Sequence, residues 1–430
     1  MAPIALRVSV LAVAASAAPS SPSSAAGGAL PSWQQPFLDP LIPPYGGARL
    51  LSNRTVWQRL FMGSTAVGAY AMSPMLGFSP SVGFLASWKL SAADEDEPGQ
   101  KIMYAYSADG ATWLPSDASD GRNVLFPSMN SSENPRVALF AEPPLLLDGR
   151  MYAAASPRQF CLYPDQYQDI LLLRRVLGPG SFGPLFWAAP VIPPGFALAS
   201  AAANVSALPQ QDAQTRADVA LLSPDARARP CAPENAAGTS KCEACVGACQ
   251  PWPVALNISS LENERTHWVV PRGGGAEVLL YRSHNRVLYA SRREAPGGEW
   301  TVPVPTNITD TVSNFNGGNL PASMGGGAYL VSNALITIIR DPLFFSFAPD
   351  GVAFTSTAAI GSCEDAAVFA SPQQPWGCLY RIAGGAKEGG LQYPQAAVVT
   401  HASAPGLFVI VSLNKEDIWI ARTPLEDLPQ

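Results

Sequence analysis

Leu391-Gln-Tyr-Pro394, which leads into Ser412-Leu-Asn-Lys-Glu-Asp-Ile418, is one of three similar segments within residues 314–425. The others are Gly318-Asn-Leu-Pro321, leading into Tyr329-Leu-Val-Ser-Asn333, and Arg340-Asp-Pro-Leu343, leading into Ser346-Phe-Ala-Pro-Asp-Gly351. Each combines a short apolar or aromatic strand, a polar turn, and a charged or aromatic residue at a strand end. Short strands bounded by turn residues are typical of all-β proteins. We therefore expect an all-β fold, with Arg340 and Tyr393 as the first candidates for function.

Hairpins that end in a turn and an aromatic residue also occur outside this stretch. A strand over 101–107 runs into Ser107-Ala-Asp-Gly-Ala-Thr-Trp113, where the Asp can bond back into the turn and the Trp can pack beneath it. Pro296-Gly-Gly-Glu-Trp300 and residues 346–354 repeat this arrangement less strictly. A weak repeat of this kind indicates the blades of a β-propeller.

The composition limits the class of protein. The chain has 430 residues, of which 47% are hydrophobic and only 14% charged, with 36 Gly and 42 Pro. It is long enough to bury a large core and rich in turn residues. The formal net charge of −6 and the lack of a basic run argue against a nucleic-acid partner. A few converging arginines can still bind an anion locally.

The N-terminus has the features of a secretory signal. Arg7 precedes the small and apolar run from Val8 to Ala18, and Ala15-Ser-Ala17 fits a cleavage site. We expect a signal peptide over 1–18, a flexible leader over 19–45 and a propeller over 46–428; the alternative for the first segment is a disordered Ala-rich tail. The apolar run is far below the ~20 residues needed to span a membrane, so we expect no membrane span.

Glycosylation sequons favour the same compartment, and we expect the protein to be secreted. The five N-x-S/T sites begin at Asn53, Asn130, Asn204, Asn257 and Asn307.

Cysteines in an exported chain are expected to be oxidised. Four of them, Cys231, Cys242, Cys245 and Cys249, lie in a Pro/Ala/Asn-rich insertion over 200–262 that we place between blades. The C-x2-C spacing there also suits zinc, but no His lies nearby, so we favour disulfides and expect no metal and no cofactor. Cys363 and Cys378 are close enough to close one surface loop, and Cys161 is left over.

The ordered segments of the C-terminal part resemble the sialidase-like, BNR-repeat superfamily. The resemblance covers about residues 262–427, and Ser107–Trp113 is similar to a short form of the superfamily's Asp-box. The matching features, in order, are Glu264 upstream of Tyr281-Arg282, Leu288-Tyr-Ala-Ser291 with Trp300, Arg340-Asp-Pro-Leu343 before Asp350-Gly351, and Gln392-Tyr393-Pro394 before Phe408-Val-Ile-Val-Ser412. The resemblance implies a six-bladed propeller with a glycan pocket at its axis.

The resemblance also implies roles for individual residues. Tyr393 would be the nucleophile, Glu264 its base partner, and Arg282 and Arg340 two arms of a clamp for a substrate carboxylate. The first arm stays open among Arg49, Arg54 and Arg59, and no N-terminal aspartate stands out as the acid. The chemistry is coherent without the family, because guanidinium groups bind carboxylates bidentately and a phenol needs a neighbouring base.

Each candidate also has a purely structural interpretation. Arg282 and Arg340 could be paired strand-end arginines, Tyr393 a core aromatic, and Glu262 could replace Glu264. His284 at a hairpin tip could be a base, a substrate contact or a solvated turn residue, and Glu142 is a further candidate.

We expect a secreted hydrolase that cleaves acidic terminal sugars from a glycan. The alternatives are another glycosidase or a polysaccharide lyase using His284 and Arg282, and a propeller that binds glycan or protein without turnover.

Overall fold

The computed structural model describes most of the chain from Trp33 onward. The described residues are 33–43, 45–92, 94, 99–115, 122–128, 137–159, 171–188, 261–271, 273–337, 339–369, 378–382 and 387–429. They belong to a compact unit over Ser32–Gln430, and the other unit, Met1–Pro31, lies outside them. The predicted signal peptide, residues 200–260 of the predicted insertion with its four cysteines, and Cys161 also lie outside the described residues, whereas 261 and 262 belong to a strand.

The described residues form antiparallel sheets with very little helix, which confirms the all-β prediction. In chain order the strands are β1 (Val56–Met62), β2 (Tyr70–Ser79), β3 (Gly83–Ser91), β4 (Lys101–Ser107), β5 (Val124–Phe126), β6 (Val137–Leu147), β7 (Arg150–Gln159), β8 (Leu171–Gly178), β9 (Ser181–Phe182), β10 (Phe186–Ala188), β11 (Leu261–Val269), β12 (Glu277–Ser283), β13 (Val287–Arg293), β14 (Val304–Thr309), β15 (Asn316–Asn319), β16 (Ala328–Ser332), β17 (Leu343–Ala348), β18 (Ser356–Gly361), β19 (Leu391–Val399), β20 (Gly406–Leu413) and β21 (Asp417–Thr423). The short helices are η1 (Ala322–Met324), α5 (Ala366–Phe369) and η2 (Leu425–Asp427). No helix among the described residues is long and apolar enough to cross a membrane.

The strands group into five sheets among the described residues. Their strand orders are β2-β3-β4-β5, β6-β7-β8-β10 with β9 beside β8, β11-β12-β13-β14, β15-β16-β17-β18, and β19-β20-β21-β1. A repeated up-and-down sheet of about four strands is the blade of a propeller. The predicted number of six blades stays a prediction, because the 72 residues from 189 to 260 lie outside the described part.

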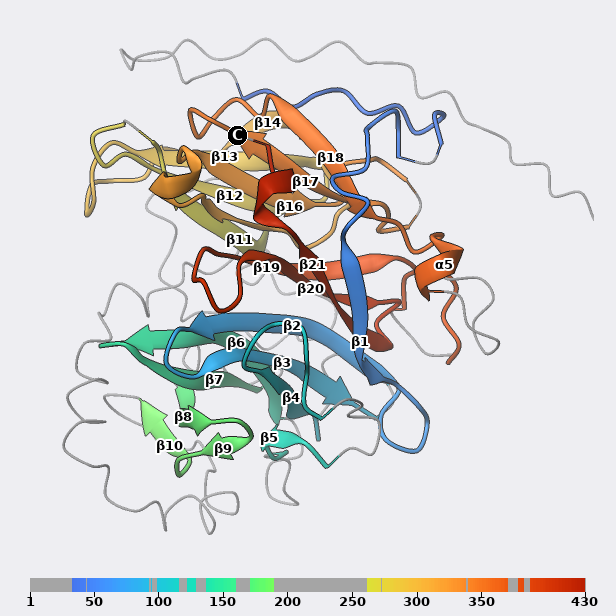
Figure 1. Cartoon of the computed structure of the whole chain (residues 1–430). Helices are drawn as coiled ribbons and strands as arrows, with labels where there is room; N and C mark the ends of the chain where they lie inside the picture. Colours follow the sequence, from blue (N-terminus) through green and yellow to red (C-terminus); the bar gives the residue numbers. More distant parts are fainter. Residues whose placement is uncertain are drawn as a thin grey trace, which may run out of the picture. The chain divides into compact units, whose positions relative to one another are not determined.

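The first strand of the chain closes the last sheet rather than starting the first one. β1 pairs antiparallel with β21, from Val56 opposite Arg422 to Met62 opposite Asp417, and in Figure 1 blue β1 lies beside red β21. An N-terminal strand in this position covers a sheet edge that would otherwise expose unpaired backbone groups. The sequence predicted strands near residues 50–70 but not this partner.

The first strands of three sheets, β2, β6 and β19, are interrupted at an X-Pro step. The pairing register shifts between Met72 and Met75 in β2, between Glu142 and Leu145 in β6, and between Gln392 and Gln395 in β19. Each shift contains a proline, which has no N–H to donate to the neighbouring strand, so the ladder opens there. The bend turns the residue before the proline out of the regular alternation of the strand.

The predicted Asp turn forms between β4 and β5. The Asp109 carboxylate accepts hydrogen bonds from the Ala111 and Thr112 N–H groups at 2.9 and 2.8 Å, and Trp113 is fully buried beneath. Asp350 makes the same two bonds, to Val352 and Ala353, after β17. Both turns follow the third strand of their sheet, so they lie at the edge opposite to the starts of the first strands.

Candidate functional site

The antiparallel order of each sheet brings the candidate residues to one edge. The first strand of a sheet begins at the edge where the second strand ends and the third begins. Tyr393 lies near the start of β19, Arg282 near the end of β12, His284 in the β12–β13 turn, and Arg340 in the β16–β17 connection. All four are therefore at the edge opposite to the Asp109 and Asp350 turns.

Tyr393 has a strained backbone at the register shift of β19. Its φ is +53°, in the left-handed region, and it precedes Pro394. This conformation costs on the order of 1 kcal/mol for a non-glycine residue, and Ser73 adopts it too at the equivalent step before Pro74 in β2. The side chain is 6% exposed and packs against Ala69, Tyr70 and Met72.

Arg340 lies beside Tyr393, in the loop between β16 and β17. Its Cζ is 5.5 Å from the centroid of the Tyr393 ring, and the two side chains share a hydrogen bond. Its Nη1 donates to Gln392 Oε1 at 3.2 Å, and its Nη2 forms an ion pair with Glu388 Oε2 at 2.6 Å. The guanidinium thus contacts three side chains, those of Tyr393, Gln392 and Glu388.

Backbone contacts fix the Arg340 loop to β19. The Asn333 side-chain amide donates to the carbonyls of Arg340 at 2.9 Å, Pro342 at 3.1 Å and Leu391 at 3.2 Å, and it is fully buried. The Arg340 N–H donates to the Gly389 carbonyl at 3.0 Å. The position of Arg340 relative to Tyr393 is therefore set by main-chain bonds and not by the arginine side chain alone.

Two further cations approach this pair. Lys415 Nζ is 5.8 Å from the centroid of the Tyr393 ring, and Arg282 is close enough to repel Arg340 electrostatically. Burial and the Arg282 charge oppose ionisation of Arg340, but the negative charges offered by Tyr393 and Glu388 outweigh them and raise the pKa of Arg340. The structure therefore brings together three of the predicted site residues, Tyr393, Arg340 and Arg282.

The other predicted site residues occupy different positions. Glu264 lies in β11 between Leu261, which pairs with Ser283, and Arg265, which pairs with Tyr281. Its backbone therefore runs beside β12, the strand that carries Arg282. The Glu264 side chain is not among the described side chains. His284 is exposed in the β12–β13 turn. Glu142 is buried at the register shift of β6, where Ser156 Oγ donates to its carboxylate at 2.5 Å.

Two of the three arginines left open for the first arm have side-chain partners in the structure. Arg54 pairs at the surface with Glu426 at 3.0 Å and with Asp427, and Arg59 stacks over Trp419. Arg54 therefore has a structural role, because it ties the turn before β1 to η2.

A buried ionic cluster next to Tyr393 was not predicted. Glu416, fully buried in the β20–β21 turn, accepts the N–H groups of Arg381 and Ile382 and an ion pair from Lys387 at 2.9 Å. Lys387 also donates to the Ala69 carbonyl at 2.9 Å and lies 4.6 Å from the Tyr70 ring centroid. The cluster anchors Arg381, Ile382 and Lys387, which precede β19. Sequence offers only a weak signal for it, the polar run 414–417.

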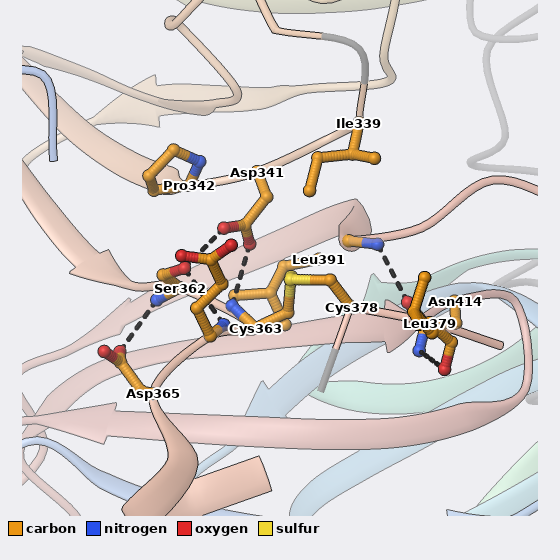
Figure 2. Close-up of a disulfide and its surroundings, with 12 residues drawn as sticks. Ile339, Asp341, Pro342, Ser362, Cys363, Asp365, Cys378, Leu379, Leu391 and Asn414 are labelled. Atoms are coloured by element: carbon orange, nitrogen blue, oxygen red, sulfur yellow. Dashed lines mark hydrogen bonds between the residues drawn. A yellow bond between two sulfur atoms is a disulfide. The ribbon is translucent and has the colours of Figure 1, made fainter. Parts of the chain in front are cut away.

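The disulfide lies beside Asp341, the residue that follows Arg340. Cys363 and Cys378 are bonded, as predicted, and both are buried. Figure 2 shows the Asp341 carboxylate facing Ser362 and Cys363: Ser362 Oγ donates to it at 2.5 Å and the Cys363 N–H at 2.9 Å. Asp341 and the two sulfurs lie close enough to hold a metal, but the sulfurs are already bonded to each other.

Comparison with known proteins supports the fold. No family model and no curated protein matches the sequence. A solved sialidase is similar with a TM-score of 0.59 over 88% of this chain at 17% identity, and the chain spans 34% of that protein's length. Also similar are a mutant of NanB sialidase from Streptococcus pneumoniae (10% identity, 87% of this chain, 71% of that one, TM-score 0.48) and a protein of unknown function from Dyadobacter fermentans (12% identity, 86% of this chain, 99% of that one, TM-score 0.48). The chain has the sialidase-like β-propeller fold, as its resemblance predicted.

Proposed function

We propose that the protein is a secreted glycoside hydrolase that removes acidic sugars from glycan ends. Tyr393 is the nucleophile and Glu264 its base partner. Arg340 and Arg282 hold the acidic group of the sugar, and His284 and Glu142 contact the rest of the glycan.

The contact between Arg340 and Tyr393, with Arg282 nearby, carries this proposal. A phenol with an ordinary pKa of about 10 is a weak nucleophile at neutral pH. Positive charge beside a phenol favours its ionised form, and a neighbouring base can take its proton. The same cations attract an anionic substrate, so one cluster can bind the sugar and activate the nucleophile.

The path of β11 supports Glu264 as the base partner. Its backbone is paired with the strand that carries Arg282, one of the cations beside Arg340. Glu264 lies near the start of β11, the first strand of its sheet, as Tyr393 lies near the start of β19. Glu262 lies two residues earlier in the strand and is its natural comparison.

The test is turnover by the intact secreted chain. Fluorogenic glycosides of sialic acid, glucuronic acid and neutral sugars are offered to the wild type and to Tyr393→Phe, Glu264→Gln and Arg340→Ala. We expect hydrolysis of an acidic glycoside that falls by at least about 10²-fold in each variant. Arg54→Ala is the matched control, since it removes an arginine from a surface ion pair. Full activity of Tyr393→Phe would contradict the assignment.

A polysaccharide lyase is the second candidate. It is favoured by one observation, an exposed imidazole at His284 two residues after the buried Arg282. A lyase needs a base and a cation that neutralises a uronate carboxylate. Release of an unsaturated uronate, seen as ultraviolet absorbance and lost in His284→Ala, would favour the lyase over the hydrolase. Binding that depends on Arg340 without any turnover would instead indicate a non-catalytic glycan-binding propeller.

A further inference from the structure

The anion-binding face of Arg340 is already occupied by a carboxylate of the same chain. Glu388 Oε2 lies 2.6 Å from Arg340 Nη2, which is the geometry expected for a bound substrate carboxylate. The Arg340 side chain is only 8% exposed and the Glu388 side chain 48% exposed. Glu388 therefore lies between the buried guanidinium and the solvent.

The partners of Arg340 differ in how easily they can be displaced. Gln392 is fully buried and Tyr393 nearly so, whereas Glu388 is half-exposed. Glu388 is thus the partner that an incoming anion can replace without unpacking the core. A carboxylate that replaces another carboxylate leaves the number of ion pairs unchanged.

Contacts on both sides hold Glu388 in place, so rotation of its side chain is the simplest way to uncover Arg340. Lys387 is held by Glu416 and by the Ala69 carbonyl, both at 2.9 Å. On the other side, the Gly389 carbonyl accepts the Arg340 N–H at 3.0 Å, and the Gly390 N–H donates to Asn414 Oδ1 at 2.8 Å. Rotation of the Glu388 side chain would uncover Arg340 without movement of the chain.

The local charge explains why an internal anion is present. Arg282 repels Arg340, and the buried Lys415 places its Nζ 5.8 Å from the centroid of the Tyr393 ring. Two cations that lie close together in a buried site repel each other, and this arrangement is costly unless an anion pairs with them. Glu388 supplies that opposite charge.

We propose that Glu388 is an internal competitor for the acidic group of the ligand and thereby a specificity-determining residue. An anionic sugar binds to Arg340 by displacing Glu388, and its apparent affinity is lowered by that competition. A neutral sugar has no anionic group that could replace the Glu388 carboxylate at Arg340, so Glu388 stays in place. This inference rests on the proposed function for the nature of the ligand, namely an acidic sugar.

Binding of free sugars to the intact chain tests the inference without requiring turnover. Glucuronate and N-acetylneuraminate are titrated calorimetrically, with glucose as the neutral probe. Glu388→Gln keeps the shape of the side chain but removes its charge, and Glu299→Gln removes the same charge from an exposed position in the β13–β14 connection. We expect Glu388→Gln to bind at least one acidic sugar about three- to tenfold more tightly than the wild type, with no gain for glucose and none in Glu299→Gln.

A double variant identifies where the gain arises. If Glu388 competes for Arg340, adding Arg340→Ala to Glu388→Gln abolishes the gain. Thermal unfolding of each variant verifies that it is folded. Unchanged, weaker or absent binding of both acidic sugars by folded Glu388→Gln would overturn the inference, as would a gain that survives the loss of Arg340.

The outcomes separate this inference from the proposed function. A gain in binding without hydrolysis of any glycoside would support the competition and contradict the hydrolase. Hydrolysis that depends on Tyr393, with no effect of Glu388→Gln on binding, would support the hydrolase and contradict the competition.

Discussion

The guanidinium of Arg340 lies over the ring of Tyr393, 5.5 Å from its centroid, and shares a hydrogen bond with its side chain. The two residues come from neighbouring sheets, since Arg340 precedes β17 and Tyr393 lies in β19. The Asn333 side-chain amide, which donates to the Leu391 carbonyl, and the bond from the Arg340 N–H to the Gly389 carbonyl hold the two segments together. A cation fixed in this way both orients the phenol and favours its ionised form.

We predict that Arg340→Lys lowers kcat/KM by at least about 10²-fold although it keeps the positive charge. A lysine ammonium is a point charge and cannot bond to Gln392, Glu388 and Tyr393 in the planar arrangement of a guanidinium. Steady-state kinetics with the turned-over glycoside measures the effect. Activity within about twofold of wild type would show that charge alone suffices.

We predict that Asp341 makes the folded protein less stable as the pH rises. Burial raises the pKa of Asp341 to about 7, against the opposing effect of its bonds from Ser362 and Cys363. A carboxyl with a raised folded-state pKa binds protons more tightly when folded, so its contribution is complete below about pH 4 and is lost as the pH approaches about 7. The loss is on the order of 4 kcal/mol.

Asp341→Asn tests this prediction. Urea unfolding at about pH 4.5 and about pH 7.5 should show a smaller fall in the free energy of unfolding for the variant than for the wild type. A residual fall is expected from Asp417, whose pKa burial raises to about 6 although Arg381 opposes the shift. An identical fall in both proteins would exclude Asp341 as its source.

We predict that removal of the disulfide destabilises the fold. Cys363 and Cys378 are separated by 15 residues, and opening a loop of this length costs about 3 kcal/mol. The double variant Cys363→Ser/Cys378→Ser should unfold at a lower urea concentration than the oxidised wild type. Addition of a reductant should move the wild type toward the variant and leave the variant unchanged; equal midpoints without reductant would refute the expected contribution.

We predict that the Asp109 turn affects stability but not catalysis. Hydrogen bonds from Thr112 and Ala111 lower the pKa of Asp109, so its contribution is present above about pH 4 and is lost as the pH falls through the lowered value. Asp109→Ala should cost about 1–2 kcal/mol at neutral pH and leave kcat unchanged, because the turn lies at the edge opposite to Tyr393. A fall in kcat at a temperature where the variant is folded would contradict this separation.

We predict glycosylation at Asn53 and Asn307 in a secretory expression host. Both sequon asparagines are exposed, Asn53 in a turn before β1 and Asn307 in β14. Peptide mass spectrometry before and after treatment with an N-glycosidase measures the occupancy, with Asn53→Gln and Asn307→Gln as controls. Secretion with both sites unmodified would contradict it.

Local patterns in the sequence were enough for the class of fold and part of the site. The turn at Asp109 and the pairing of Cys363 with Cys378 depend on short-range chemistry, and both are present. The meeting of Arg340 and Tyr393 was expected from the order of segments in a resembling family, and it follows physically from the antiparallel order of the sheets.

Features that depend on distant partners were not predictable. The pattern of β1 indicates a strand but not its pairing with β21, because an apolar alternation fits many neighbours. Asn414 to Asp417 form a polar hairpin turn, which is usually exposed, yet it is buried against Arg381 and Lys387. Glu388 is an ordinary acidic residue in the sequence, and only its contact with Arg340 indicates a role in the site.

Covalent trapping tests the central claim, that Tyr393 is the nucleophile, most directly. A fluorinated analogue of the turned-over glycoside, carrying a good leaving group, slows release of the sugar from a retaining enzyme and lets the glycosyl-enzyme accumulate. Peptide mapping of the trapped wild-type protein should place the sugar on Tyr393, and Tyr393→Phe should remain unlabelled. Labelling of Glu264 or Glu142, or turnover without any label on Tyr393, would contradict the account.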